Sequence, residues 1–139
     1  GINVALGTDS AASNNRLDLF AEMRLASLLA KVTQGDAAAL PAATVLRMAT
    51  LGGARAVGLD DRIGSLVPGK DADVVAVDFS SVALAPCYDP VSHLVHAAGR
   101  EHVTDVWIEG ERLVDSGRLV RLDSAAITAR AAIWRDRIA

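Results

Sequence analysis

The sequence predicts an α/β fold, because an apolar strand, helices with one apolar face and a later run of strands follow one another along the chain. Residues 2–6 form a short apolar run between Gly1 and Gly7, which is typical of a parallel strand covered on both faces. Apolar residues spaced three and four apart over 17–32 then predict an amphipathic helix. Together these segments form one strand-loop-helix unit, and shorter strand-like runs begin beyond residue 62.

Further helices are expected before residue 60 and at the end of the chain. Pro41 suits a first helical turn, and the apolar residues between 43 and 51 fall on one helical face. We expect the Gly52-Gly53 pair to interrupt this helix and residues 54–59 to add one or two more turns. Asp123 and Ser124 can cap a final amphipathic helix over residues 125–138.

The middle of the chain is expected to be β structure with a hairpin. Residues 74–78 have the composition of a buried strand. Residues 103–108 and 112–115 flank a tight connection at Glu109, Gly110 and Glu111, so they should pair. These boundaries divide the chain into residues 1–61, 62–122 and 123–139.

Composition and charge exclude several classes of partner. The net charge is −3 with acidic and basic residues interspersed, so neither nucleic acid nor a membrane is an expected partner. The apolar stretches are interrupted by charges well before the ~20 residues that a bilayer span needs. A single cysteine, Cys87, excludes an internal disulfide, which suits a cytoplasmic protein. Gly1 opens directly on the predicted strand, so we expect the parallel partners of this strand in an upstream part of the same protein.

Asp9 is the candidate functional residue, because it follows the predicted strand directly. In α/β folds, and in (β/α)8 barrels above all, functional groups lie on the loops at the carboxyl ends of the strands. An Asp after a strand can also serve only as a turn residue or a helix N-cap. The helix starts several residues later, however, and the small residues over 10–13 leave room for a ligand beside the carboxylate.

Three segments carry motifs that resemble a known enzyme family. They are G-T-D-S-A-A-S-N-N-R-L-D-L-F-A-E-M-R-L-A at 7–26, the stretch from A-T-L-G-G-A-R-A-V-G-L to I-G-S-L-V-P-G-K-D-A-D-V-V-A-V-D at 49–78, and D-P-V-S-H-L-V-H-A-A-G-R-E-H-V-T-D-V-W-I-E-G at 89–110. The whole chain resembles the carboxyl-terminal third of the amidohydrolase superfamily. The first segment is similar to the branch of methylthioadenosine/S-adenosylhomocysteine deaminases and triazine chlorohydrolases.

The resemblance implies a metal-dependent (β/α)8 barrel whose eighth strand is residues 2–7, followed by part of a small β-sandwich over 62–122 and a C-terminal helix. It also implies one divalent metal, zinc or iron, held by histidines from earlier strands and by Asp9. We expect those histidines upstream of this chain. The 139-residue chain alone is therefore expected to be inactive.

The resemblance further implies a hydrolase that acts on a C–N bond of an aminopurine-type heterocycle such as S-adenosylhomocysteine or methylthioadenosine. Metal-bound hydroxide would attack a ring carbon, and Asp9 would carry the proton of the water to the departing amine. Asp9, Ser10 and Asn14 are candidate substrate contacts, although Asn14 can equally order its loop. A homo-oligomer is expected.

Two alternatives stay open. The first is hydrolytic dechlorination or deamination of an s-triazine, because the same attack on an electron-poor ring serves both reactions. The second is a non-catalytic fragment that acts only in folding or oligomerisation.

We expect the other reactive side chains to have structural rather than catalytic roles. His93, His96 and His102 are expected to be partly buried structural histidines rather than metal ligands. Glu22 and Arg24 are expected to form a helix-surface or inter-helix ion pair. Lys70 lacks the spacing of a phosphate-binding loop.

Overall fold

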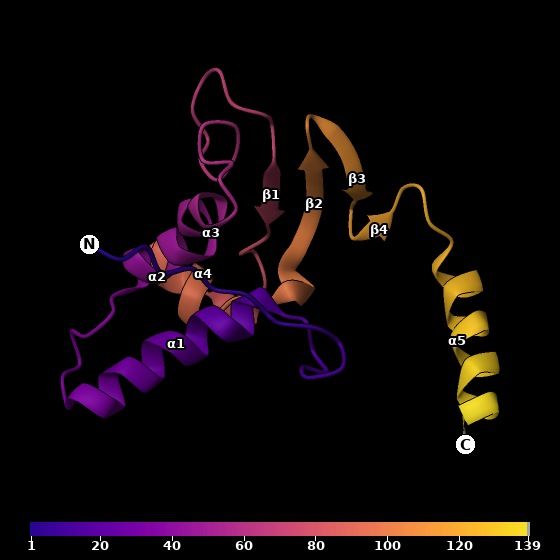
Figure 1. Cartoon of the computed structure of the whole chain (residues 1–139), viewed down its shortest axis with the longest axis horizontal. Helices are drawn as coiled ribbons and strands as arrows, with labels where there is room; N and C mark the ends of the chain where they lie inside the picture. The colour runs from indigo at the N-terminus through magenta and orange to yellow at the C-terminus, as the bar shows by residue number, and fades with distance from the viewer. Residues whose placement is uncertain (139) are drawn as a thin grey trace.

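A computed structural model describes residues 1–138 as a group of helices beside a small antiparallel sheet (Figure 1). The helices beside the sheet are α1 (Leu19–Gln34), α2 (Ala42–Ala49), α3 (Leu51–Ala56) and α4 (Pro90–His96). The strands are β1 (Val74–Val77), β2 (Val103–Ile108), β3 (Glu111–Asp115) and β4 (Arg118–Leu119). Short 3₁₀ turns cover Val82–Leu84 and Arg100–His102, and α5 (Ser124–Ile138) ends the described chain. Ala139, which belongs to the predicted 123–139 segment, lies outside the described residues.

The core joins three helices that are far apart in the sequence. Met23 of α1, Val45 of α2 and Val95 of α4 are buried together, and Leu6 and Phe20 pack against them. Helix α4 was not predicted from the sequence. Asp89 caps this helix by accepting hydrogen bonds from the N–H groups of the residues two and three positions later, and a proline occupies its first turn. Residues 90–96 therefore pack with the first helices, and the proposed division at residues 61 and 122 stays a prediction.

The predicted first helix is confirmed, with a start two residues later than its apolar pattern. The Asp18 carboxylate caps α1 by accepting from the N–H groups of Phe20, at 3.1 Å, and Ala21, at 3.4 Å. Leu17 has a φ of +46° and is outside the helix. This left-handed backbone turns the incoming loop onto the helix axis before the cap.

The predicted interruption between the second and third helices is misplaced by two residues. The break is at Thr50, with φ −114° and ψ −93°, and its hydroxyl donates to the Leu46 carbonyl at 2.8 Å. Gly52 and Gly53 lie inside α3 instead. At Gly52 a Cβ atom would lie 2.9 Å from the Val4 carbonyl oxygen. The glycine therefore permits the backbone of the extended segment to approach the backbone of α3 closely.

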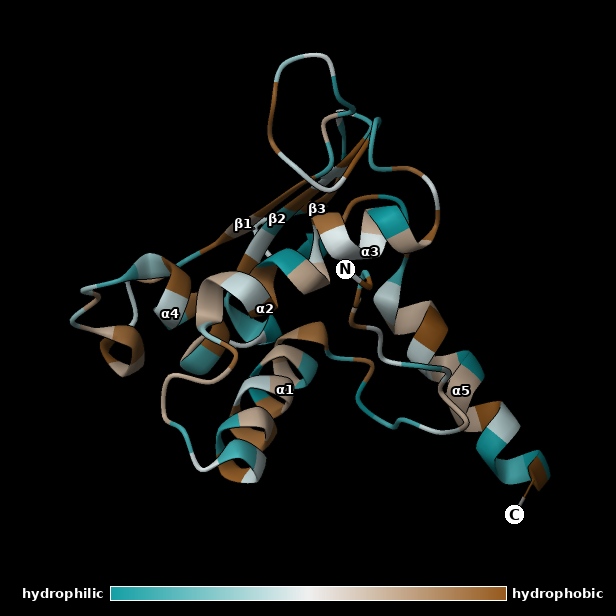
Figure 2. Ribbon diagram, turned by 60° about the vertical axis from the view of Figure 1, so that its left-hand side comes forward, coloured by the Kyte–Doolittle hydropathy of each residue, from teal (hydrophilic) through white to brown (hydrophobic). Residues whose placement is uncertain are grey.

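The predicted hairpin is confirmed, and the sheet has the order β1-β2-β3-β4 with antiparallel pairing throughout. Glu109 and Gly110, with φ of +50° and +79°, join β2 to β3 as the tight connection. Positive φ at both central residues is the signature of the type I′ turn, whose twist matches that of the flanking strands. Ser116 and Gly117 repeat this pattern between β3 and β4. Brown, apolar stretches alternate with hydrophilic positions along the strands in Figure 2.

The prediction of a buried strand over residues 2–6 is wrong for this structure. The segment is extended but is assigned no strand, and the side chains of Ile2 and Val4 are 94% and 55% exposed. A parallel strand needs hydrogen-bonding neighbours on both edges, and among the described residues this segment hydrogen-bonds only to Met48 of α2 and Gly52 of α3. The apolar run therefore lies against helices on one side and is open on the other.

The final helix is confirmed, but it stands apart from the rest of the molecule (Figure 1). Asp123 accepts hydrogen bonds from the N–H groups of Ala125 and Ala126, as the capping prediction requires. No residue of α5 is buried, and the side chains of its apolar face, Ile127 and Trp134, are about half exposed.

Candidate active site

Asp9 lies at the end of the extended segment, where the chain leaves the helices and enters a loop. Two contacts hold the segment that carries it. The Leu6 N–H donates to the Met48 carbonyl at 3.3 Å, and the Asn3 side-chain amide donates to the Gly52 carbonyl at 3.0 Å. Asp9 itself has a φ of +58°, a left-handed conformation that Asp and Asn adopt more readily than other non-glycine residues.

The carboxylate of Asp9 is exposed and is stabilised as an anion. The Ser13 hydroxyl and the Ser10 N–H, which donates to Oδ1 at 2.8 Å, hold the pKa of Asp9 below its ordinary range. Asp9 is therefore negatively charged at neutral pH. A charged, accessible carboxylate can bind a cation or accept a proton.

The loop after Asp9 is organised by the Ser10 main chain. Its carbonyl oxygen accepts from the N–H groups of Ser13, at 3.1 Å, and Asn14, at 2.9 Å. The Ser10 hydroxyl oxygen accepts from the Ala12 N–H at 3.3 Å, and its own O–H has no acceptor among residues 1–138. The loop therefore forms a compact turn directly beside the Asp9 carboxylate.

Asn14 uses both ends of its side-chain amide within the protein. Its Nδ2 donates to Glu22 Oε1 at 2.7 Å, and its Oδ1 accepts from the Arg16 N–H at 3.0 Å. Two roles were considered for Asn14, substrate contact and ordering of the loop. These contacts agree with ordering of the loop. The expected pairing of Glu22 with Arg24 is wrong, because Arg24 Nη2 instead donates to the Ala98 carbonyl at 2.6 Å.

A second set of contacts fixes the far end of the loop. Arg100 Nη1 donates to the Arg16 carbonyl at 2.7 Å, and Arg16 Nη2 pairs with the buried Asp18 carboxylate at 3.1 Å. Both arginines thereby connect the loop to the start of α1 and to the turn before β2. This role of Arg16 and Arg100 was not predicted from the sequence, because the contact between them spans 84 residues.

His93 and His102 make local hydrogen bonds, and His96 is partly buried. His93 Nε2 lies 2.6 Å from the Leu84 carbonyl oxygen, with the ring edge against Phe79, and His102 Nδ1 accepts from the Gly99 N–H at 3.1 Å. Burial lowers the pKa of His96, and the nearby charges of Lys31 and Arg24 lower it further. Within residues 1–138, no three His, Cys, Asp or Glu side chains lie close enough together to hold a metal ion.

Lys70 has a structural role. Its ammonium group donates to the carbonyl oxygens of Asp60 and Ile63 and so closes the loop that precedes β1.

An open cavity of about 590 Å³ lies along the other half of the extended segment. Residues 1–4 form one wall, and side chains of α2 and α3, including Arg47 and Arg55, form the other. Asp9 is not among the residues that line it. The candidate site at Asp9 is therefore an exposed loop surface in this structure.

Comparison with known families gives a match for most of the chain. A sequence profile of the amidohydrolase family matches residues 1–113. The chain belongs to the amidohydrolase family. The motif that begins at Gly7 and contains Asp9 lies within the matched range.

Curated proteins with high similarity to this chain are named as deaminases. The 5-methylthioadenosine/S-adenosylhomocysteine deaminase of Teredinibacter turnerae is 51% identical over 138 residues, which are 99% of this chain and 31% of the relative. The 5'-deoxyadenosine deaminase of Methanosarcina acetivorans is 45% identical over 94% of this chain and 30% of the relative. The chain thus spans about a third of the length of these relatives.

Solved structures of amidohydrolases agree with the fold of this chain. An adenosine deaminase from Xanthomonas campestris with bound zinc matches 99% of this chain and 31% of its own, with a TM-score of 0.96 and 54% identity. The zinc complex of atrazine chlorohydrolase from Arthrobacter aurescens TC1 matches 96% of this chain and 30% of its own, with a TM-score of 0.88 and 31% identity. Both kinds of enzyme in the branch named by the sequence resemblance, deaminases and a triazine chlorohydrolase, are therefore represented, which confirms the resemblance.

The helices described over residues 1–138 include none with the length and apolar composition that a membrane crossing requires.

Proposed function

We propose that this chain is the carboxyl-terminal part of a metal-dependent hydrolase that deaminates an aminopurine-type heterocycle such as S-adenosylhomocysteine or methylthioadenosine. One observation carries the proposal: 51% identity over almost the whole chain to a 5-methylthioadenosine/S-adenosylhomocysteine deaminase. Asp9, which is anionic and exposed at the end of the extended segment, would supply the carboxylate that this reaction needs as a metal ligand and proton acceptor.

The residues of this chain fit zinc as a partial site. Asp9 is a charged, accessible oxygen ligand, and the zinc-bound relatives support zinc as the metal. Protein zinc sites use three or four side-chain ligands, and no group of three is present among residues 1–138. Asp9 would therefore be one ligand, and the others would come from elsewhere in the protein. When bound, zinc lowers the pKa of a water molecule towards neutrality.

Asp9 would also move the proton in this reaction. Its Oδ1 accepts from the Ser10 N–H, so we assign proton transfer to Oδ2. The carboxylate is ionised at neutral pH, so it is ready to accept a proton from the attacking water and to return it to the departing amine. Ser10, whose O–H has no acceptor among residues 1–138, is our candidate for a substrate contact, and we assign Asn14 to ordering the loop.

We further propose that residues 1–61 complete a (β/α)8 barrel and that residues 62–122 are part of a small β-sandwich. The TM-scores support the arrangement of these parts as in the longer relatives. Burial of residues 2–6 does not support it, because that segment is open on one side in this structure. Parallel neighbours for this segment, and a homo-oligomeric assembly, belong to the same proposal.

The test is a substrate comparison with the full-length protein that carries this chain. We expect stoichiometric zinc and release of ammonia from S-adenosylhomocysteine or methylthioadenosine, with a higher kcat/KM than for dechlorination of atrazine. The opposite preference would favour the triazine alternative, which the 31% identity to atrazine chlorohydrolase supports. A protein without zinc and without turnover on either class would support the non-catalytic alternative.

A further inference from the structure

Within residues 1–138, one side-chain hydrogen bond anchors the loop after Asp9 to a helix. Most of the hydrogen bonds of residues 10–15 stay within the loop or reach the adjacent Asp9 and Arg16. Among the described residues, the bond from Asn14 Nδ2 to Glu22 Oε1, at 2.7 Å, is the one that ties this stretch to a helix. A bond from an amide to a carboxylate is charge-assisted and stronger than a neutral one.

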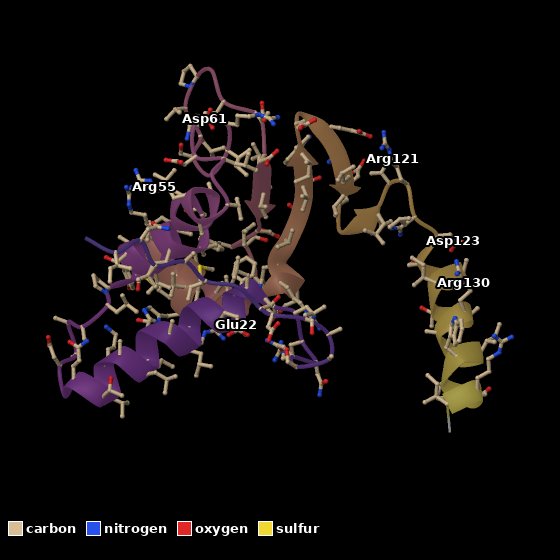
Figure 3. All side chains as sticks on the ribbon, viewed as in Figure 1. Glu22, Arg55, Asp61, Arg121, Asp123 and Arg130 are labelled. Atoms are coloured by element: carbon tan, nitrogen blue, oxygen red, sulfur yellow. The ribbon has the colours of Figure 1, made fainter. Side chains whose placement is uncertain are left out.

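Glu22 is a rigid support for this anchor. It lies in the first turn of α1, next to Met23, which is 4% exposed in the core. Asp18 caps the same turn, so the backbone around Glu22 is fixed from both sides. Glu22 is partly buried, and Figure 3 places it at the end of α1 from which the loop emerges.

A continuous series of hydrogen bonds leads from Glu22 to Asp9. Glu22 accepts from the Asn14 side chain, and the Asn14 main-chain N–H donates to the Ser10 carbonyl at 2.9 Å. The Ser10 N–H then donates to Asp9 Oδ1 at 2.8 Å. The orientation of the Asp9 carboxylate is therefore coupled to the position of α1.

We propose that Glu22 is a positioning residue that holds Asp9 in its working orientation through Asn14. The inference rests on the proposed function of Asp9, and it assigns Glu22 no contact with substrate or metal. Mutation of a residue that orients a metal ligand without binding the metal itself typically lowers metal affinity or activity by about 10- to 100-fold.

The experiment compares Glu22→Ala, Glu22→Gln and Ser27→Ala in the zinc-loaded full-length protein. Ser27→Ala is the matched control, because it removes a buried hydrogen bond from α1 to the Leu40 carbonyl without touching the loop. For Glu22→Ala we expect kcat to fall about tenfold or more with a smaller change in KM, and zinc to dissociate faster into a chelator. Glu22→Gln retains the acceptor oxygen and should restore most of both properties.

Amide hydrogen exchange of residues 10–14 provides a readout that needs no activity. Glu22→Ala should speed exchange at Ser13 and Asn14, whose N–H groups donate to Ser10, and Ser27→Ala should not. Equal exchange, zinc retention and kcat in Glu22→Ala and Ser27→Ala would overturn the positioning role. If the unmodified protein lacks zinc and turnover, the proposed function fails, and the exchange comparison still decides whether Glu22 orders the loop.

Discussion

The side-chain amide of Asn3 donates to the main-chain oxygen of Gly52 at 3.0 Å, across 49 residues of sequence. This bond and the contact of Leu6 with Met48 are what align the extended segment on α2 and α3. Gly52 presents no side chain to the segment, so the two backbones approach closely. The position of the extended segment that leads to Asp9 therefore depends on the absence of a Cβ atom at Gly52 of α3.

The first prediction concerns this close approach. In Gly52→Ala the new methyl group would meet the Val4 carbonyl at 2.9 Å and the Arg47 carbonyl at 3.1 Å. We expect a loss of about 1–3 kcal/mol in the free energy of unfolding, measured by denaturant titration. Gly53→Ala is the control, because its nearest atom is 3.9 Å away, and alanine should stabilise the helix there by about 0.5–1 kcal/mol. Equal stability of the two variants would contradict the packing argument.

The second prediction concerns Asp9 in the full-length protein. Asp9→Asn keeps the size of the side chain and tolerates the φ of +58°, but it removes the charge and the proton acceptor. Turnover should fall about 10²-fold or more while circular dichroism stays unchanged. Asp36→Asn, on an exposed turn before α2, serves as the control and should keep full turnover. Normal turnover and zinc content in Asp9→Asn would reduce Asp9 to a turn residue.

The third prediction concerns acid stability of the sheet. Arg112 holds the pKa of Asp105 below its ordinary range through a hydrogen bond and its charge, helped by Thr104 and by the Ser116 N–H. Because the folded-state pKa is the lower one, this stabilisation is present above about pH 4 and is lost as the pH falls below it. Asp105→Asn should therefore flatten the dependence of unfolding free energy on pH in that acidic window.

A double-mutant cycle checks the partner of Asp105. Arg112→Gln should flatten the same acidic window, and combining it with Asp105→Asn should change the slope little further. If Arg112→Gln leaves the slope at its original value, the cause assigned to the low pKa of Asp105 is wrong.

The fourth prediction concerns the 139-residue chain alone. One carboxylate ligand cannot hold zinc at useful affinity, so we expect far less than one zinc per chain and no release of ammonia from S-adenosylhomocysteine. Metal analysis and a coupled ammonia assay on the purified chain measure both. Turnover by this chain, at a rate comparable to that of the full-length protein, would overturn the proposal that most of the metal ligands lie elsewhere.

Local sequence signals predicted the elements whose structure is determined locally. Asp18 caps the start of α1, and Gly35 caps its end. Glu109 and Gly110 adopt the positive φ values that a two-residue hairpin loop needs. The break at Thr50 was missed because glycines are the stronger breakers in sequence, whereas here Gly52 is required by contact with Val4. That requirement comes from a residue 48 positions earlier, which no local pattern reveals.

Long-range contacts explain the remaining differences. Residues 2–6 have the composition of a buried strand, but burial also depends on neighbours that the pattern itself does not supply. Asp9 was predicted as the candidate site from its place after this run. Glu22 was assigned to a surface pair, because its contact with Asn14 depends on how the intervening loop folds back.

The separation of α5 from the sheet gives the chain two distinct fluorescent reporters. Its two tryptophans are Trp107, partly buried in β2 beneath the Arg112 guanidinium, and Trp134, which is 55% exposed on α5 beside Arg137. A short helix without packing partners is marginal in water, so α5 should melt before the sheet does. Emission from Trp134 would then follow the fraying of the chain end, and emission from Trp107 would follow the cooperative loss of the fold.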